Sequence, residues 1–208
     1  VSAEERPTLL VRIPSIEREG EQAARARVHD ALTRGADGIV LPHIRSPEEA
    51  RVAVRFFEEA EADVWSPANP NGRIIAMLMI EDPGALEAAE AIAETPGYSV
   101  LSCGIGSLTG ALGDDRDAGE TAAEVILGHA TRVGMPSMMT ANRANLAHRI
   151  DQVIDIRDGV VEVAGDADVA VLSERGHGDF DSVFLLQSFL QRVDASVSGF
   201  EIGLSWQR

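Results

Sequence analysis

Residues Arg73–Gly113 read RIIAMLMIED, PGALEAAEAIAETPG and YSVLSCGIGSLTGALG, and this stretch decides the fold class. Two apolar runs, Ile74–Ile80 and Tyr98–Cys103, flank an alanine-rich segment of helical character. A connection of this length is typical of a crossover between parallel strands, because antiparallel strands need only a short hairpin. Ligands in parallel α/β folds collect at the carboxyl ends of the strands. We therefore expect the functional site where these two strands end.

Each of these strands is followed by residues that suit a binding site. The first is followed by Glu81-Asp82, which places carboxylates where a buried strand meets its loop. Neighbouring residues on a strand point in opposite directions, so Glu81 is the stronger candidate of the two. The second strand is followed by Gly104-Ile105-Gly106-Ser107, a glycine-containing turn whose backbone amides can face an anion. We expect a carboxylate and an anion-binding turn at the same edge of the sheet.

Two further strands are predicted earlier in the chain. Thr8–Ile13 is a short apolar run that contains Arg12, and Gly38–Leu41 is a second run that ends at Pro42-His43. A charged side chain in an apolar strand is costly without a partner anion, which favours a functional role for Arg12 over a structural ion pair. His43 directly follows a buried strand, where an imidazole can transfer a proton or simply bond within its loop.

Helices are predicted between these strands and in the second half of the chain. Ser46-Pro47-Glu48-Glu49 predicts a helix start, with Ser46 as N-cap and Glu49 completing a capping box. Phe180–Val193 has the pattern of an amphipathic helix. The other expected elements are helices over 17–35, 83–97 and 120–133, loops over 63–72 and 114–118, strands at 136–141 and 169–172, and a helical or extended segment at 145–156.

This alternation of about six strands with helices predicts a parallel α/β fold. A doubly wound sheet and a (β/α)-barrel both agree with the pattern. A barrel usually needs about 250 residues, with about 200 as a lower limit, and the chain has 208. We expect one α/β domain over residues 1–179. Residues 180–208 are expected to form a helix and tail that pack on this domain or on a neighbouring subunit.

Composition excludes several classes of function. With 34 acidic and 18 basic residues, the chain has a formal net charge of −16, whereas nucleic acids and anionic membranes need a basic surface. The sequence contains no lysine, which excludes Schiff-base catalysis, a lysine-anchored pyridoxal cofactor and the lysine of a phosphate-binding loop. One cysteine, Cys103, excludes an internal disulfide and a cysteine-rich zinc site. No apolar run has the length of a membrane span and no secretory pattern is visible, so a cytoplasmic location is expected.

Four stretches together resemble the metal-dependent 2-keto-acid aldolases of the HpcH/HpaI and citrate-lyase-beta superfamily. LVRIP at Leu10–Pro14 is similar to the family's strand with a substrate-binding arginine. ALTRGADGIVLPHIRSPEEA at Ala31–Ala50 is similar to its helix end, "GA-GI-vP" strand and following helix. Met79–Glu81 corresponds to the strand that ends in the metal-binding glutamate, and GIGSLTGALG at Gly104–Gly113 corresponds to "GPxDLSxxLG".

The resemblance implies a TIM-type barrel, incomplete or modified at its N-terminus, in a homo-oligomer. It implies Mg²⁺, Mn²⁺ or Co²⁺ bound by Glu81, and a small carboxylate or 2-keto acid such as pyruvate as substrate. Arg12 would stabilise the enolate, the amides of residues Gly104 to Ser107 would bind the substrate carboxylate, and His43 is the candidate for proton transfer. Such a metal acts as a Lewis acid, which suits a lysine-free lyase.

The chain departs from the family pattern at several positions. Ser107 stands where the family has a second metal carboxylate, and Met79 stands where aldolases often have a glutamine. No early strand with the family's proton-transfer histidine precedes Arg12. Asp114 and Asp115 are the candidates for a replacement carboxylate. The simpler interpretation is that Ser107 is an N-cap or turn residue and that both aspartates lie on the surface.

Three hypotheses about function follow. The first is an aldolase-type carbon–carbon lyase that works through a metal-stabilised enolate. The second is a non-catalytic or repurposed barrel that binds a small carboxylate ligand. The third is a citrate-lyase-like thioester lyase, for which the sequence shows no coenzyme A site.

Overall fold

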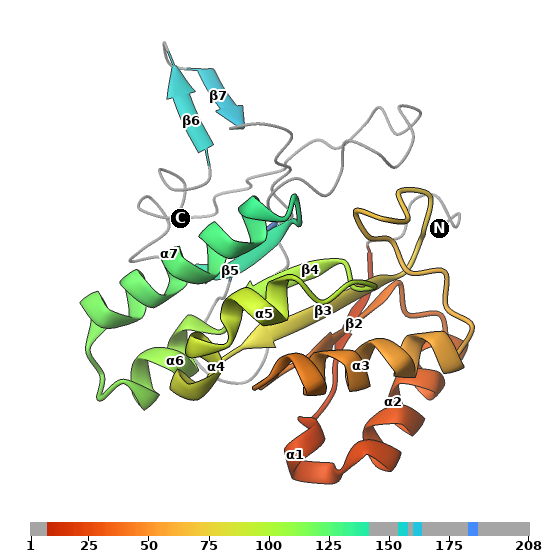
Figure 1. Cartoon of the computed structure of the whole chain (residues 1–208). Helices are drawn as coiled ribbons and strands as arrows, with labels where there is room; N and C mark the ends of the chain where they lie inside the picture. Colours follow the sequence, from red (N-terminus) through yellow and green to blue (C-terminus); the bar gives the residue numbers. More distant parts are fainter. Residues whose placement is uncertain (1–7, 142–153, 158–159, 164–182, 187–208) are drawn as a thin grey trace, which may run out of the picture.

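The computed structural model describes residues 8–141, 154–157, 160–163 and 183–186 (Figure 1). Its main feature is a six-stranded sheet with the order β1-β2-β3-β4-β5-β8. Strands β1 to β5 are parallel to their neighbours, and β8 pairs antiparallel with β5. The strands are β1 Leu10–Arg12, β2 Gly38–Leu41, β3 Ile75–Ile80, β4 Val100–Cys103, β5 Ser137–Ala141 and β8 Val183–Leu186. The five parallel strands confirm the predicted parallel α/β class.

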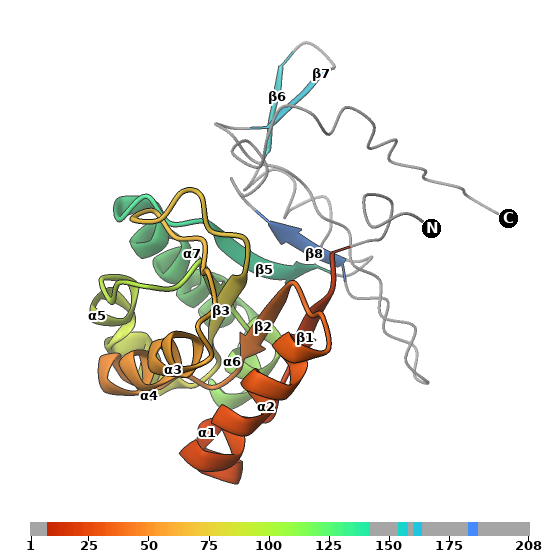
Figure 2. The same ribbon diagram turned by 90° about the vertical axis from the view of Figure 1, so that its right-hand side faces the viewer.

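The helices lie together on one face of the sheet, as Figure 2 shows. They are α1 Ile16–Glu19, α2 Glu21–Thr33, α3 Pro47–Glu59, α4 Pro83–Glu87, α5 Ala89–Ala93, α6 Ile105–Ala111 and α7 Arg116–Arg132. A doubly wound sheet reverses its strand order and carries helices on both faces, whereas a (β/α)-barrel keeps its strands in chain order with the helices outside. The order from β1 to β5 and the one-sided helices are those of a barrel wall.

Strand β3 shows how the sheet separates two apolar clusters. All six of its residues are buried, as expected for a parallel strand covered on both faces. Ala76, Leu78 and Ile80 pack in the cluster beneath the helices. Ile75, Met77 and Met79 pack on the opposite face, with Val40, Trp65, Val100 and Met138. This opposite face, called here the inner face, continues with the next residue of the same parity, Glu81.

The predicted start of α3 is confirmed with one difference. Ser46 is the N-cap, and its Oγ accepts a hydrogen bond from the Glu49 amide at 3.2 Å. The Glu49 carboxylate does not return to the Ser46 amide as in a standard capping box. It accepts instead from the Arg45 amide, one residue earlier, at 2.8 Å. The sequence pattern therefore located the helix start correctly, although the reciprocal bond is shifted by one residue.

Several predicted elements have different bounds in the structure. The helix predicted over 17–35 is divided at Gly20, whose φ of 82° ends α1, and the helix predicted over 83–97 is divided at Ala88. The loop predicted over 114–118 is shorter, because Asp115 caps α7 and its Oδ1 accepts from the Ala118 amide at 3.0 Å. The strand predicted at 136–141 is confirmed as β5.

The helix predicted over Phe180–Val193 is wrong at Val183–Leu186, which form β8. These four apolar residues suit a strand as well as a helix, because a short apolar run has no diagnostic period. Pairing with β5 decides in favour of the strand, since it satisfies backbone groups at that sheet edge. The rest of that segment, including residues 187–193, lies outside the described residues, and the division at residue 179 stays a prediction.

Two predictions about the segment after β5 are only partly covered. Within 145–156, the described residues belong to strand β6 Ile154–Arg157, which pairs antiparallel with β7 Val160–Val163. The predicted strand at 169–172 lies outside the described residues. None of the helices in the described part of the chain has the length and apolar character needed to cross a bilayer.

Candidate active site

The centre of the site is the carboxylate of Glu81, which follows β3 on the inner face. The carboxylate side chain of Glu81 is only 4% exposed. Burying a carboxylate requires a cationic partner or several hydrogen bonds. Both are present, because Oε2 of Glu81 accepts from the Arg12 guanidinium and from the His43 amide, each at 3.2 Å.

Arg12 is the last residue of β1, and β2 separates it from β3 in the sheet. Its Nη2 lies 3.2 Å from Glu81 Oε2, and its side chain is 55% exposed. The guanidinium therefore neutralises the buried carboxylate while much of it faces solvent. A guanidinium has five N–H donors, so the pairing with Glu81 leaves donors for an anionic ligand.

His43 lies after the end of β2, and its backbone has a φ of 56°. This left-handed conformation is uncommon for residues other than glycine, and such strain persists where the surrounding structure imposes it, often at functional sites. Here the strained backbone directs the amide of His43 at Glu81. The imidazole Nδ1 lies 3.1 Å from Asp82 Oδ2, and Nε2 lies 3.5 Å from Glu81 Oε2.

Asp82 occupies the N-cap of α4 but makes no side-chain capping bond. An aspartate at this position usually accepts a hydrogen bond from the first turn of its helix. Its carboxylate is bonded to His43 Nδ1 instead. Asp82 therefore fixes the orientation of the imidazole, a contact that the sequence did not predict.

Gly104 follows β4 and lies against Glu81. A Cβ added at Gly104 would lie 2.3 Å from Glu81 Cγ and 2.6 Å from its Oε1, both far inside van der Waals contact. The Glu81 side chain thus occupies space that only a glycine at position 104 leaves open. The Gly104 amide, which the sequence predicted to bind an anion, instead donates a hydrogen bond to the Ile80 carbonyl at 2.9 Å, and the structure gives Gly104 this steric role.

The predicted anion-binding turn is the beginning of helix α6. Gly104 is the N-cap, and Ile105, Gly106 and Ser107 form the first turn of the helix. The Gly104 cap provides no side-chain hydrogen bond, so the first amides of α6 lack that partner. Ser107 is exposed and stands in the third position of the helix, so the interpretation of Ser107 as an N-cap is wrong. Asp115, considered as a replacement carboxylate, caps α7.

The chemistry of the donor set agrees with a metal site that the substrate completes. The described residues contain no group of three or more His, Cys, Asp or Glu side chains that could hold a metal ion. Mg²⁺ is nevertheless often bound through one or two carboxylates together with substrate oxygens and water. Ser107 stands where the family has its second metal carboxylate, so the described carboxylates of this site are Glu81 and Asp82, and Asp82 is bonded to His43.

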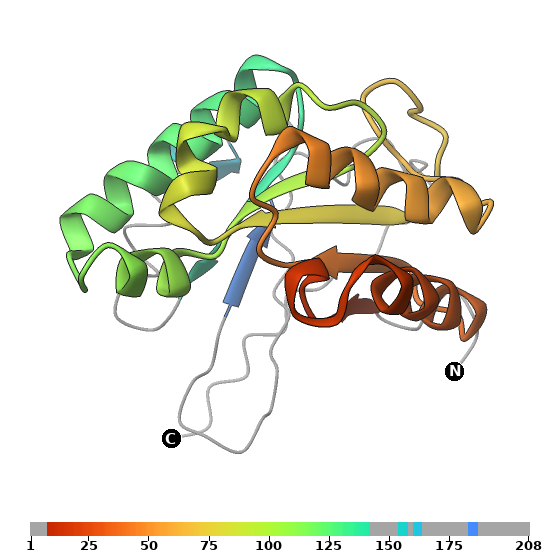
Figure 3. The same cartoon turned by 60° about the horizontal axis from the view of Figure 1, so that its bottom comes forward.

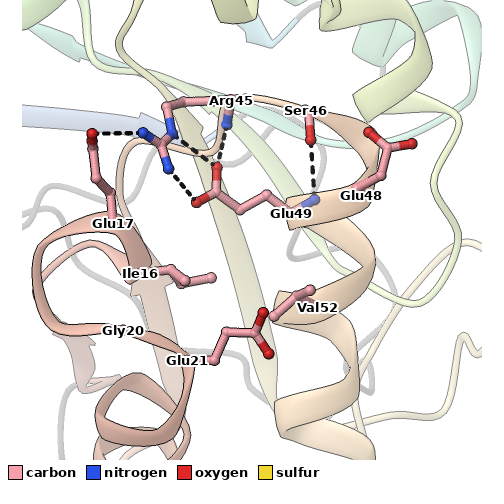
Figure 4. Close-up of a pocket in the computed structure, with 9 residues that line it drawn as sticks. All are labelled: Ile16, Glu17, Gly20, Glu21, Arg45, Ser46, Glu48, Glu49 and Val52. Carbon is pink, nitrogen blue, oxygen red and sulfur yellow. Dashed lines mark hydrogen bonds and ion pairs between the residues drawn. The ribbon is translucent and has the colours of Figure 1, made fainter.

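A separate surface pocket of about 580 Å³ lies between α1, α2 and α3, which pack side by side (Figure 3). Figure 4 shows Arg45 between Glu17 and Glu49, with ion-pair distances of 2.8 and 3.1 Å. Hydrogen bonding to Glu49 raises the pKa of the Arg45 guanidinium, and burial opposes this shift. The lining includes none of the predicted site residues, and its one arginine is already neutralised by glutamates. This pocket is therefore distinct from the Glu81 site.

Solved structures with the same fold were found by comparison. An HpcH/HpaI aldolase/citrate lyase family protein from Burkholderia cenocepacia is 23% identical, with a TM-score of 0.54, over 69% of this chain and 62% of that one. An HpcH/HpaI aldolase from Desulfitobacterium hafniense is 21% identical, with a TM-score of 0.54, over 70% of this chain and 62% of that one. The citrate synthase SbnG is 19% identical, with a TM-score of 0.51, over 69% of this chain and 60% of that one.

The chain thus spans about three fifths of the length of these structures. A search of the curated proteins found no match. The sequence itself matches the family description "HpcH/HpaI aldolase/citrate lyase" over residues 2–172, which is most of the chain. The match includes β1 to β5 and every residue that surrounds Glu81. The protein belongs to the HpcH/HpaI aldolase/citrate lyase family.

Proposed function

We propose that the protein is an aldolase-type carbon–carbon lyase that acts on a small 2-keto acid such as pyruvate. The observation that carries this proposal is the convergence of Arg12, His43 and Gly104 on the buried carboxylate of Glu81. These residues come from the ends of four neighbouring parallel strands. Family membership supports the reaction class.

In the cleavage direction, a base takes the proton from the hydroxyl of a 4-hydroxy-2-keto acid. The bond between C3 and C4 then breaks, an aldehyde leaves, and the electron pair forms an enolate on the keto oxygen. Arg12 is the proposed group that neutralises this oxygen, and its half-exposed guanidinium beside Glu81 supports this role. The amides of residues 105–107 at the start of α6 are the proposed partners of the substrate carboxylate.

His43 is the proposed proton carrier. Asp82 accepts a hydrogen bond from Nδ1 when that nitrogen is protonated, which leaves Nε2 to exchange a proton with the substrate. Glu81 is the proposed carboxylate ligand of a divalent cation, with the substrate oxygens as further ligands. When bound, such a cation supplies Lewis-acid polarisation of the keto group.

The experiment that tests this proposal is exchange of the pyruvate methyl protons in heavy water, followed by NMR. The exchange requires removal of a methyl proton and return of a deuteron to the enolate, and needs no knowledge of the aldehyde. It should be measured with Mg²⁺, Mn²⁺ and Co²⁺ and with a chelator. Exchange that depends on the metal supports the proposal that the protein is a lyase. If the folded protein shows no exchange under any of these conditions, the proposal is contradicted.

The proton-transfer role predicts a specific effect of His43→Asn. Asparagine tolerates the left-handed backbone at this position, so the melting temperature should change by only a few degrees. The amide cannot transfer the proton, so exchange should fall by about a hundredfold or more. His29→Asn, at an exposed position of α2, is the matched control and should exchange the pyruvate methyl protons at the rate of the unchanged protein. Full exchange in His43→Asn would remove His43 from the mechanism.

The non-catalytic alternative is favoured by one observation, the exposed hydroxyl of Ser107 where the family has a carboxylate. Ser107→Asp adds that carboxylate in the first turn of α6, where the helix dipole stabilises a negative charge. We expect Mn²⁺ affinity, measured by calorimetry, to increase at least about tenfold. If exchange also begins only in this variant, the natural protein is a carboxylate-binding barrel. Unchanged Mn²⁺ affinity would show that position 107 does not face the metal.

A further inference from the structure

Among the described residues of the inner face is a buried hydroxyl without a hydrogen-bond partner. Ser102, in β4, is fully buried, and its Oγ has no hydrogen-bond partner within the described part of the chain. Its neighbours across the sheet are Met79 in β3 and Met138 in β5, and both have buried side chains in the inner apolar cluster. A buried unbonded hydroxyl is costly, because folding removes its hydrogen bonds to water and returns none.

Ser102 lies on the inner face of the sheet, earlier along the strands than the Glu81 site. Side chains two residues apart on a strand share a face and are separated by about 7 Å. Ser102 is two residues before Gly104, whose missing side chain accommodates Glu81. Met79, its partner in the sheet, is likewise two residues before Glu81. The Ser102 hydroxyl therefore lies on the same face as the Glu81 carboxylate, one step of about 7 Å earlier along the strands.

Another serine of the same region shows that the fold can satisfy a buried hydroxyl here. Ser99, immediately before β4, is also fully buried. Its Oγ accepts from the Ala76 amide at 2.8 Å and donates to the Trp65 carbonyl at 2.6 Å. Ser99 thus has a structural role, whereas Ser102 has no such bonds. An apolar residue without a hydroxyl at position 102 would pack in the methionine cluster without this cost.

We infer that Ser102 is a ligand-binding residue, whose hydroxyl donates a hydrogen bond to an oxygen of the bound 2-keto acid. This inference rests on the proposed function and assigns a positioning role to a residue outside the set around Glu81. The flanking methionines have unbranched, flexible side chains that can move to admit the ligand. The hydroxyl is then a polar group among the apolar side chains of the inner face, and it orients the ligand relative to Arg12 and Glu81.

Two serine variants of the full chain separate a ligand-binding hydroxyl from a structural one. The measurements are the dissociation constant for pyruvate, by NMR titration, and the melting temperature without ligand. In Ser102→Ala we expect pyruvate affinity to fall about tenfold or more, with the melting temperature unchanged or higher. In Ser99→Ala we expect the melting temperature to fall by several degrees, because the Ala76 amide and Trp65 carbonyl lose their partner, while pyruvate affinity is retained.

Each other outcome is decisive. If Ser102→Ala binds pyruvate like the unchanged protein, or melts as early as Ser99→Ala, the inference is overturned and the proposed function is unaffected. If the unchanged protein does not bind pyruvate, the proposed function fails, and the inference fails with it. Ser102→Cys keeps the shape of the side chain with a slightly larger atom and a weaker donor. It should also lose affinity, and it replaces the alanine variant if that one does not fold.

Discussion

Glu81→Gln is expected to reduce pyruvate exchange by at least about a hundredfold while leaving the protein folded. The glutamine has the same shape and can still accept from the His43 amide, but it cannot balance the charge of Arg12 or serve as an anionic metal ligand. Because the Arg12 side chain is 55% exposed, water can solvate the guanidinium when Glu81 loses its charge. The stability cost should therefore be small, about 1 kcal/mol.

The measurements for Glu81→Gln are methyl exchange by NMR and thermal unfolding by circular dichroism. Glu59→Gln is a matched control, because it removes a glutamate charge from another ion pair with an arginine. Glu59 Oε2 lies 2.9 Å from Arg25 Nε, and both side chains are about half exposed. Glu59→Gln should keep the exchange rate of the unchanged protein and nearly all of its stability. Exchange that persists in Glu81→Gln at the unchanged rate would remove Glu81 from the mechanism.

Gly104→Ala is expected to reduce both the stability of the protein and the exchange of pyruvate protons. The added Cβ would lie 2.3 Å from Glu81 Cγ, so the glutamate side chain must move or the start of α6 must shift. Overpacking of this kind costs about 1–3 kcal/mol. Displacement of the carboxylate from Arg12 and from the His43 amide should reduce exchange by at least about tenfold, since catalytic geometry is sensitive to shifts of about 1 Å.

Gly128→Ala provides the control for Gly104→Ala. Gly128 lies in α7, and a Cβ added there meets nothing within 4 Å. Alanine should stabilise that helix by up to about 1 kcal/mol without changing exchange. If Gly104→Ala behaves like Gly128→Ala, then the close packing of Gly104 on Glu81 is not important for the reaction.

Much of the chain could be predicted from local patterns. The apolar runs of β2, β3 and β4 and the capped start of α3 are determined by residues close together in sequence, and the structure confirms them. Arg12 and Glu81 were identifiable because a charge next to a buried strand needs a partner. Their proximity also follows from the sequence, since parallel strands present their carboxyl ends at one edge.

Other features depend on contacts between distant segments. The choice of a strand at Val183–Leu186 is made by the edge of β5, because the four apolar residues themselves suit either structure. The orientation of His43 depends on Asp82, a residue 39 positions later that leaves its own helix uncapped. A backbone with φ of 56° at a histidine has no sequence signal, because local preference opposes it.

The sequence by itself determined the parallel α/β class, the absence of lysine chemistry and the identity of the charged residues at the strand ends. The tertiary structure decided which strands are neighbours, that the helices α1 to α7 lie on one face, and that Gly104 leaves the space occupied by Glu81. It also decided that, within the residues that the structure describes, the hydroxyl of Ser99 is hydrogen-bonded and that of Ser102 is not. The physical reason is that strand and helix periods are local properties, whereas burial, close packing and hydrogen-bond satisfaction depend on residues brought together only by folding.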